Sequence, residues 1–115
     1  MVQYQQLDRA FAALSDPTRR GILDRLGRGP ASISELGAPL NMTLTGLKKH
    51  VRILEDAQLV TTEKIGRVRQ CRIETAALKT AEEWINERRT TWEHRLDRLG
   101  DYLADNPHLP TRRTT

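Results

Sequence analysis

Residues 32–57 read SISELGAPLNMTLTGLKKHVRILEDA, and they predict two short helices joined by a tight connection. Ser32 and Glu35 have the spacing of a capping box, in which each side chain bonds to a backbone amide of the other at the start of a helix. This spacing predicts a first helix over residues 33–39. Its inward-facing side chains are expected to be Ile33, Leu36 and Leu40.

A second helix is expected over residues 44–57, after a turn that ends in Thr43 as the N-cap residue. Apolar residues recur there at spacings of three and four and predict one buried face, made of Leu44, Leu47, Val51 and Leu54. An α-helix fits the major groove of B-DNA, where outward side chains reach base edges and nearby cations hold phosphates. The pair of helices therefore predicts a DNA-reading helix-turn-helix. Its outward side chains are Thr45, Lys48, Lys49 and Arg52.

A basic β-hairpin is expected next. Residues 60–65 and 68–73 both have the composition of strands, and Gly66 with Arg67 forms a tight turn between them. Beside a helix-turn-helix, such a hairpin would lie over the adjacent DNA backbone or minor groove. The basic side chains at its tip and on its arms are Lys64, Arg67 and Arg69.

Two helices precede this unit and one long helix follows it. The first two are expected over residues 4–14 and 17–27, with Asp16 as N-cap and Pro17 at the first helical position. The last is expected over residues 76–103, a length of about 42 Å at 1.5 Å per residue. A small domain cannot bury so long an apolar stripe alone, so part of it should meet a second chain. The residues expected there are Trp84, Ile85, Trp92, Leu96, Leu99 and Leu103.

The net charge of +4 is concentrated in one segment. Between Thr45 and Arg72 there are seven Lys and Arg against three Asp and Glu, while the rest of the chain has twelve of each sign. The whole excess thus lies on the helix and hairpin expected to face DNA. This favours double-stranded DNA as the partner over the alternative of a protein-interaction module that uses the long helix.

Length and cysteine content set the broad class. The 115 residues suffice for one domain, expected over residues 1–103, with a flexible tail over 104–115. Cys71, the only cysteine, excludes an internal disulfide and fits a reducing compartment. It should be a half-buried strand residue, with a redox switch as the alternative. Since no apolar run approaches roughly 18 residues, we expect a cytoplasmic protein without membrane contact.

Enzymatic motifs are missing from the sequence. It contains no glycine-rich phosphate loop and no G-x-S-x-G, and the histidines His50, His94 and His108 are scattered. We therefore expect no catalytic activity and no cofactor. We also expect no metal site, although a zinc-responsive alternative remains, because His94 and Asp97 on the last helix could supply half a site across a dimer.

Four segments carry a resemblance to a known family. They are residues 11–26 (FAALSDPTRRGILDRL), 34–36 (SEL), 49–55 (KHVRILE) and 66–67 (GR). From about Tyr4 to Leu103 the chain resembles the ArsR-type winged-helix repressors, in a branch without the family's metal-binding motifs. The resemblance implies a mainly α chain, ordered α-α-α-α-β-β-α with a two-stranded hairpin. It implies dimerisation through the first and last helices, which adds Leu7 and Phe11 to the interface, and repression from a palindrome, commonly at the chain's own promoter.

Two positions depart from this family pattern and one keeps it. Lys48 stands where members often have serine, and Gln58 stands where they often have the left-handed glycine that ends a helix. His50 keeps a family residue, which could contact a phosphate or could pack and cap within the protein. We expect a homodimeric repressor on an inverted repeat. The expected DNA contacts are Thr43, Thr45, Gly46, Lys48, Lys49, His50, Arg52, Lys64, Arg67 and Arg69.

Overall fold

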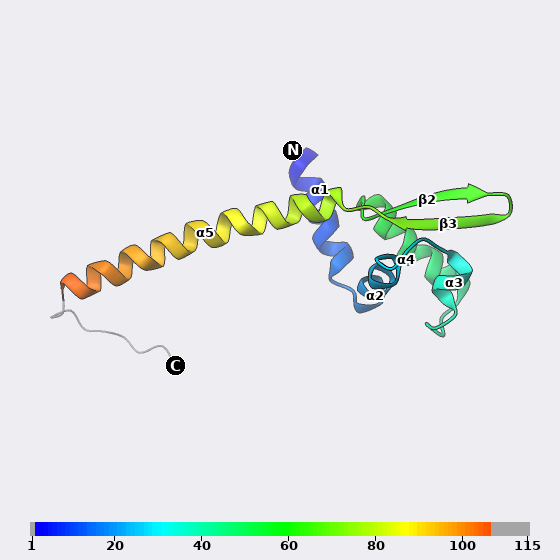
Figure 1. The fold of residues 1–115 in the computed structure, drawn as a ribbon, viewed down its shortest axis with the longest axis horizontal. Coiled ribbons are helices and arrows are strands. Elements are labelled where there is room, and N and C mark those ends of the chain that lie inside the picture. The colour runs from blue at the N-terminus through cyan, green and yellow to red at the C-terminus, as the bar shows by residue number, and fades with distance from the viewer. Residues whose placement is uncertain (1, 107–115) are drawn as a thin grey trace. The chain divides into compact units, whose positions relative to one another are not determined.

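The computed structural model describes the backbone of residues 2–106 and the side chains of residues 5–106. Apart from a strand of two residues, its elements follow the expected order, so the expected fold class is confirmed. The chain divides into two compact units, with the boundary between Glu82 and Glu83. The elements are α1 (Val2–Leu14), α2 (Pro17–Leu26), β1 (Ala31–Ser32), α3 (Ile33–Gly37), α4 (Leu44–Asp56), β2 (Val60–Ile65), β3 (Val68–Ile73) and α5 (Ala76–Asp105) (Figure 1).

The core of the first unit is built around α4. Leu47, Val51 and Leu54 recur at spacings of four and three, so they share one face of this helix, and all three are buried. Ile22 of α2 and Leu36 of α3 are buried in the same cluster. Because α4 is held by this inner face, its opposite face is left exposed to solvent.

Leu44 corrects the expected inner face of α4. The sequence predicts it as the first buried residue of that helix, but its side chain is 55% exposed. The close contact between α3 and α4 lies one turn later, where a Cβ on Gly37 would come within 2.8 Å of Leu47 Cδ2. Leu44 directly follows the N-cap Thr43. It therefore precedes the turn of α4 that packs on α3 and lies outside the core.

The expected helix caps are all present. Asp16 Oδ2 accepts a hydrogen bond from the amide of the third residue of α2 at 3.0 Å. Thr43 Oγ1 accepts one from the third residue of α4 at 3.1 Å. Ser32 and Glu35 form the reciprocal capping box of α3. Each bond satisfies a backbone donor that a helix start leaves open, so these short helices have defined first turns.

β2 and β3 form the expected antiparallel hairpin. Their pairing runs from Val60 opposite Ile73 to Ile65 opposite Val68. Gly66 in the turn has a φ of 64°, a left-handed conformation that glycine adopts without the steric cost of a Cβ. The turn therefore brings the chain straight back, as a tight hairpin requires.

β1 is a third strand that the sequence pattern does not predict. Ala31 and Ser32 pair with Cys71 and Gln70 of β3, which gives the strand order β1-β3-β2. Two residues are too few to show an alternating pattern. Opposite Ala31, Cys71 is fully buried rather than half-buried, and this burial raises the pKa of its thiol. A redox switch is therefore disfavoured, because the reactive species would be the thiolate.

The outer helices extend slightly beyond their expected ends. α1 begins at Val2, and α5 continues to Asp105. Of the expected flexible tail, residues 104 and 105 are thus helical, and residues 107–115 lie outside the described part of the chain. None of the described helices is both long and apolar enough to cross a membrane.

Gln58 occupies the left-handed position after α4. Its φ is 60°, at the place where the family resemblance predicts glycine. Its side-chain Oε1 accepts a hydrogen bond from Gln6 Nε2 of α1 at the surface. A left-handed backbone costs a residue with a Cβ about 1–2 kcal/mol, so this position stores strain that glycine would relieve.

Replacing Gln58 with glycine should raise the free energy of unfolding by about 0.5–1 kcal/mol, because the relieved strain exceeds the added freedom of the unfolded chain. Thermal unfolding should show this as a Tm higher by about 2–6 °C. The control is Gln6→Ala, which removes the hydrogen bond but leaves the backbone of Gln58 unchanged. A glycine variant no more stable than this control would contradict the strain.

Candidate nucleic-acid interface

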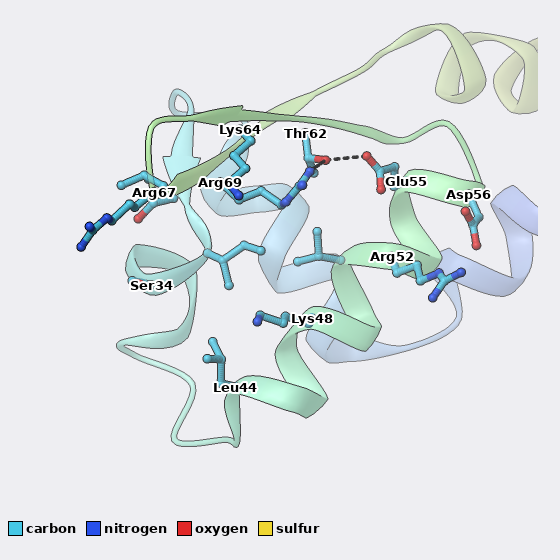
Figure 2. A pocket seen from close by; sticks show the side chains of 14 residues that line it. Ser34, Leu44, Lys48, Arg52, Glu55, Asp56, Thr62, Lys64, Arg67 and Arg69 are labelled. Carbon is cyan, nitrogen blue, oxygen red and sulfur yellow. Dashed lines mark hydrogen bonds between the residues drawn. The ribbon is translucent and has the colours of Figure 1, made fainter.

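A groove of about 920 Å³ lies between α4 and the β2–β3 hairpin, with the start of α3 contributing to its lining (Figure 2). It brings together half of the ten residues that the sequence predicts as DNA contacts. Two come from α4 and three from the hairpin, which are separate segments of the sequence. These residues are Lys48, Arg52, Lys64, Arg67 and Arg69.

Four of these cations are available to a ligand. The side chains of Lys48, Arg52, Lys64 and Arg67 are exposed. Within the described residues, no hydrogen bond or ion pair engages any of them. They can therefore pair with phosphates without breaking an internal contact, which is what binding to a polyanion requires.

Arg69 belongs instead to a chain of hydrogen bonds that crosses the groove. Its Nη1 donates to Thr62 Oγ1 at 2.9 Å, and Thr62 Oγ1 donates to Glu55 Oε2 at 2.6 Å (Figure 2). Because Glu55 lies near the end of α4, this chain links the hairpin to α4. Sequence reasoning missed Glu55 and Thr62, and only the tertiary fold brings them to Arg69.

The other expected contacts on α4 lie outside the groove lining. Thr45 and Lys49 are exposed. Thr43 uses its hydroxyl as the N-cap acceptor. A Cβ on Gly46 would lie 3.1 Å from Thr43 Oγ1, so glycine leaves the cap uncrowded. Gly46 therefore has a structural role that is independent of DNA.

His50 faces the protein. Its Nδ1 lies 3.2 Å from an Arg19 guanidinium nitrogen and 3.9 Å from Asp16 Oδ2. Arg19 also donates hydrogen bonds to the carbonyl oxygens of Ala13 at 2.8 Å and Ala12 at 3.1 Å, at the end of α1. These contacts join α1, α2 and α4, and they favour packing over phosphate binding as the role of His50.

The two residues of the zinc-responsive alternative lie on the exposed surface of α5. They are His94 and Asp97. In the part of the chain that the structure describes, no three His, Cys, Asp or Glu side chains form a group that could hold a metal ion. Structural zinc sites take four ligands and catalytic ones three, so these two residues alone do not make one.

The residues expected at a dimer interface fall into two groups. Leu7 is buried within its own chain, and Phe11 and Trp84 are partly buried. The guanidinium of Arg88 lies 4.5 Å from the centre of the Trp84 ring, a cation–π contact. Leu103 is partly exposed. The remaining four expose about half or more of their side chains along α5, and they are Ile85, Trp92, Leu96 and Leu99.

Known proteins match the chain over this region. The family model described as "Helix-turn-helix domain" matches residues 14–63. The HTH-type transcriptional regulator Rv2034 of Mycobacterium tuberculosis is 36% identical over 83 residues, which are 70% of this chain and 78% of that protein. The transcriptional repressor SdpR of Bacillus subtilis is 28% identical over 79 residues, covering 69% of this chain and 88% of SdpR.

Solved structures extend the similarity to most of the chain. The ArsR family transcriptional regulator RHA00566 is 47% identical with a TM-score of 0.75, covering 77% of this chain and 92% of its own. An ArsR-like regulator from Rhodococcus sp. RHA1 is 32% identical with a TM-score of 0.78, and the match covers 89% of this chain and 96% of that chain. The homodimeric winged helix-turn-helix DNA-binding domain Mb0332 from Mycobacterium bovis is 25% identical with a TM-score of 0.60, and the match covers 79% of this chain and 82% of that chain.

The helix-turn-helix, the hairpin beside it and the basic groove between them define a winged helix-turn-helix protein that binds DNA. With these relatives, they show that the chain belongs to the ArsR family of transcriptional regulators. It is a regulator of transcription and not an enzyme.

The stability of the first unit, residues 1–82, depends on pH through the carboxyl group of Asp16. The hydrogen bond from the Arg19 amide holds the pKa of the Asp16 carboxyl below its usual value, against an opposing effect of desolvation. The nearby charge of Arg19 lowers this pKa further. Because the pKa is lower in the folded state, the stabilisation is present above the usual carboxyl pKa and is lost as pH falls through the lowered value.

Replacing Asp16 with asparagine should lower the Tm at about pH 7, and the Tm difference should shrink as the pH falls below the usual carboxyl pKa of about 3.9, since asparagine keeps the cap acceptor but not the charge. Tm is measured for both proteins across this range. Asp16→Ser, a second uncharged N-cap, should give the same convergence. A Tm difference that stays constant with pH would exclude the carboxylate as its source.

Proposed function

We propose that this regulator is a repressor that binds an inverted repeat as a homodimer. Its own promoter is one of the proposed binding sites. The observation that carries the proposal is the groove in which α4 and the hairpin present Lys48, Arg52, Lys64 and Arg67 as exposed cations. Binding at a promoter would block access of RNA polymerase. The transcriptional repressor SdpR matches this chain over 88% of its own length, and this supports repression rather than activation. The proposed location is the cytoplasm, as for a bacterial DNA-binding regulator.

DNA recognition is assigned to the outer face of α4 and to the wing, the β2–β3 hairpin. α4 enters the major groove with its first turn leading, and the wing follows the neighbouring backbone or minor groove. His50 is assigned instead to positioning α4, through its contact with Arg19. The proposed contacts are Thr43, Thr45, Gly46, Lys48, Lys49, Arg52, Lys64, Arg67 and Arg69.

Dimerisation is assigned to the apolar face of α5 and to α1. Trp92 is 57% exposed, and four further large apolar residues on the same helix are similarly exposed. A patch of this kind is typical of a protein interface. The homodimeric relative from Mycobacterium bovis supports a second copy as the occupant. A twofold dimer places its recognition helices about 34–36 Å apart in successive major grooves, so the operator is an inverted repeat.

The first test is binding to DNA upstream of the chain's own gene, titrated with salt, with zinc and with chelator. Tight and salt-sensitive binding that ignores zinc is the expected result. Loss of binding with zinc would instead support the alternative site built from His94 and Asp97. If the protein binds no sequence specifically at any salt concentration, the proposal is wrong.

Lys48→Ala should weaken binding to every duplex and reduce the slope of log K against log salt by about 1.8 for a dimer, or about 0.9 for each phosphate that is no longer neutralised. Lys79→Ala is the matched control, because Lys79 is an exposed lysine on α5 that does not line the groove. It should leave the slope near the wild-type value. Equal slopes for both variants would remove Lys48 from the residues that bind phosphate.

Trp92→Ala should weaken the dimer by about 2 kcal/mol or more, or about thirtyfold in Kd, because a large buried aromatic is a typical interface hot spot. Analytical ultracentrifugation over a dilution series measures this change. Thr90→Ala, an exposed change on the opposite side of the same helix, should have little effect. An unchanged dimer at low concentration of Trp92→Ala would place the interface elsewhere.

A further inference from the structure

Leu44 is a largely exposed apolar side chain in a groove that also carries exposed cations. It is 55% exposed and lines the groove together with Lys48, which lies one turn further along α4 (Figure 2). Residues four apart lie on the same face of a helix. Leu44 and Lys48 therefore share the α4 face that borders the groove, and Arg67 of the hairpin lines the same groove.

A single exposed leucine on a protein surface needs no explanation, but the surroundings of this one do. Exposed cations border the same groove, and they attract a polyanion to it. When the first turn of α4 enters the major groove, Leu44 is shielded from water. Its side chain neither donates nor accepts hydrogen bonds, so any polar base atom that it covered would be left unpaired at a cost in affinity.

The apolar group that a base presents in the major groove is the C5 methyl of thymine. We propose that Leu44 packs against this methyl in each half-site of the operator and is a specificity-determining residue. The inference rests on the proposed function, because it requires α4 to enter the major groove. The Thr43 cap fixes the first turn of α4, so Leu44 has a defined backbone position before DNA binds.

The test compares thymine with uracil, which lacks only the C5 methyl. The full chain first selects duplexes from a random pool, and the thymines of the selected sequence are then replaced by uracil one at a time. One thymine in each half-site should contact Leu44. Replacing it with uracil in one half-site should weaken wild-type binding about fourfold, and replacing it in both should weaken binding about fourteenfold. Leu44→Ala should bind the thymine and uracil duplexes equally.

Two comparisons make this result specific to Leu44. Lys64→Ala, a change on the opposite wall of the groove, should weaken binding to both kinds of duplex and keep the wild-type ratio between them. Leu44→Ala should keep the wild-type Tm, because the side chain is largely exposed and alanine favours a helix. A changed ratio in Leu44→Ala then reports the absence of an interaction with the base rather than a failure to fold.

The outcomes separate this inference from the proposed function. If every uracil duplex binds the wild type as tightly as its thymine counterpart, or if Leu44→Ala keeps the wild-type ratio, the inference is overturned while DNA binding stands. If the pool yields no preferred sequence at any salt concentration, the proposed function fails, and the inference fails with it.

Discussion

The packing of Leu47 against α3 determines where α4 lies, and the DNA-facing surface depends on it. A Cβ on Gly37 would come within 2.8 Å of Leu47 Cδ2, so glycine allows the two helices to approach this closely. Val51 and Leu54 continue the same face of α4 into the core. Because one face of α4 is fixed in this way, the direction of its outer face is fixed too. The basic residues need no further support to point away from the core.

Two polar links tie α4 to its neighbours. At one side, Arg19 connects the end of α1 to His50. At the other side, Glu55 binds Thr62 of the wing. The hydrophobic core thus holds the inner face of α4, while these links hold it to α1 and to the hairpin. Recognition by a helix requires such a fixed frame, because base contacts depend on angstrom-scale placement.

Features with local causes could be predicted from the sequence, and those with distant partners could not. The caps at Asp16 and Thr43 depend on residues three positions away, and the pattern of α4 repeats within one helix. Both were predicted correctly, apart from Leu44, whose environment depends on where α3 ends. The short strand at Ala31 was missed because it exists only through its pairing with Cys71. The link of Glu55 was missed for the same reason, because no local spacing encodes it. For His50, the sequence left packing within the protein and phosphate contact as alternatives, and the structure favours packing.

The hydrogen bond between Arg69 and Thr62 has an entropic consequence for the wing. An unrestrained arginine loses rotamer freedom when it binds, at a cost of about 0.5–1.5 kcal/mol per side chain. Arg69 has already lost much of this freedom on folding, because Thr62 holds its guanidinium at 2.9 Å. Lys64 and Arg67, exposed towards the tip, keep theirs. The wing therefore combines one preorganised cation, Arg69, with two adaptable ones, Lys64 and Arg67. The restrained Arg69 gives a constant contact point, while the other two side chains can adjust to DNA backbones of different local shape.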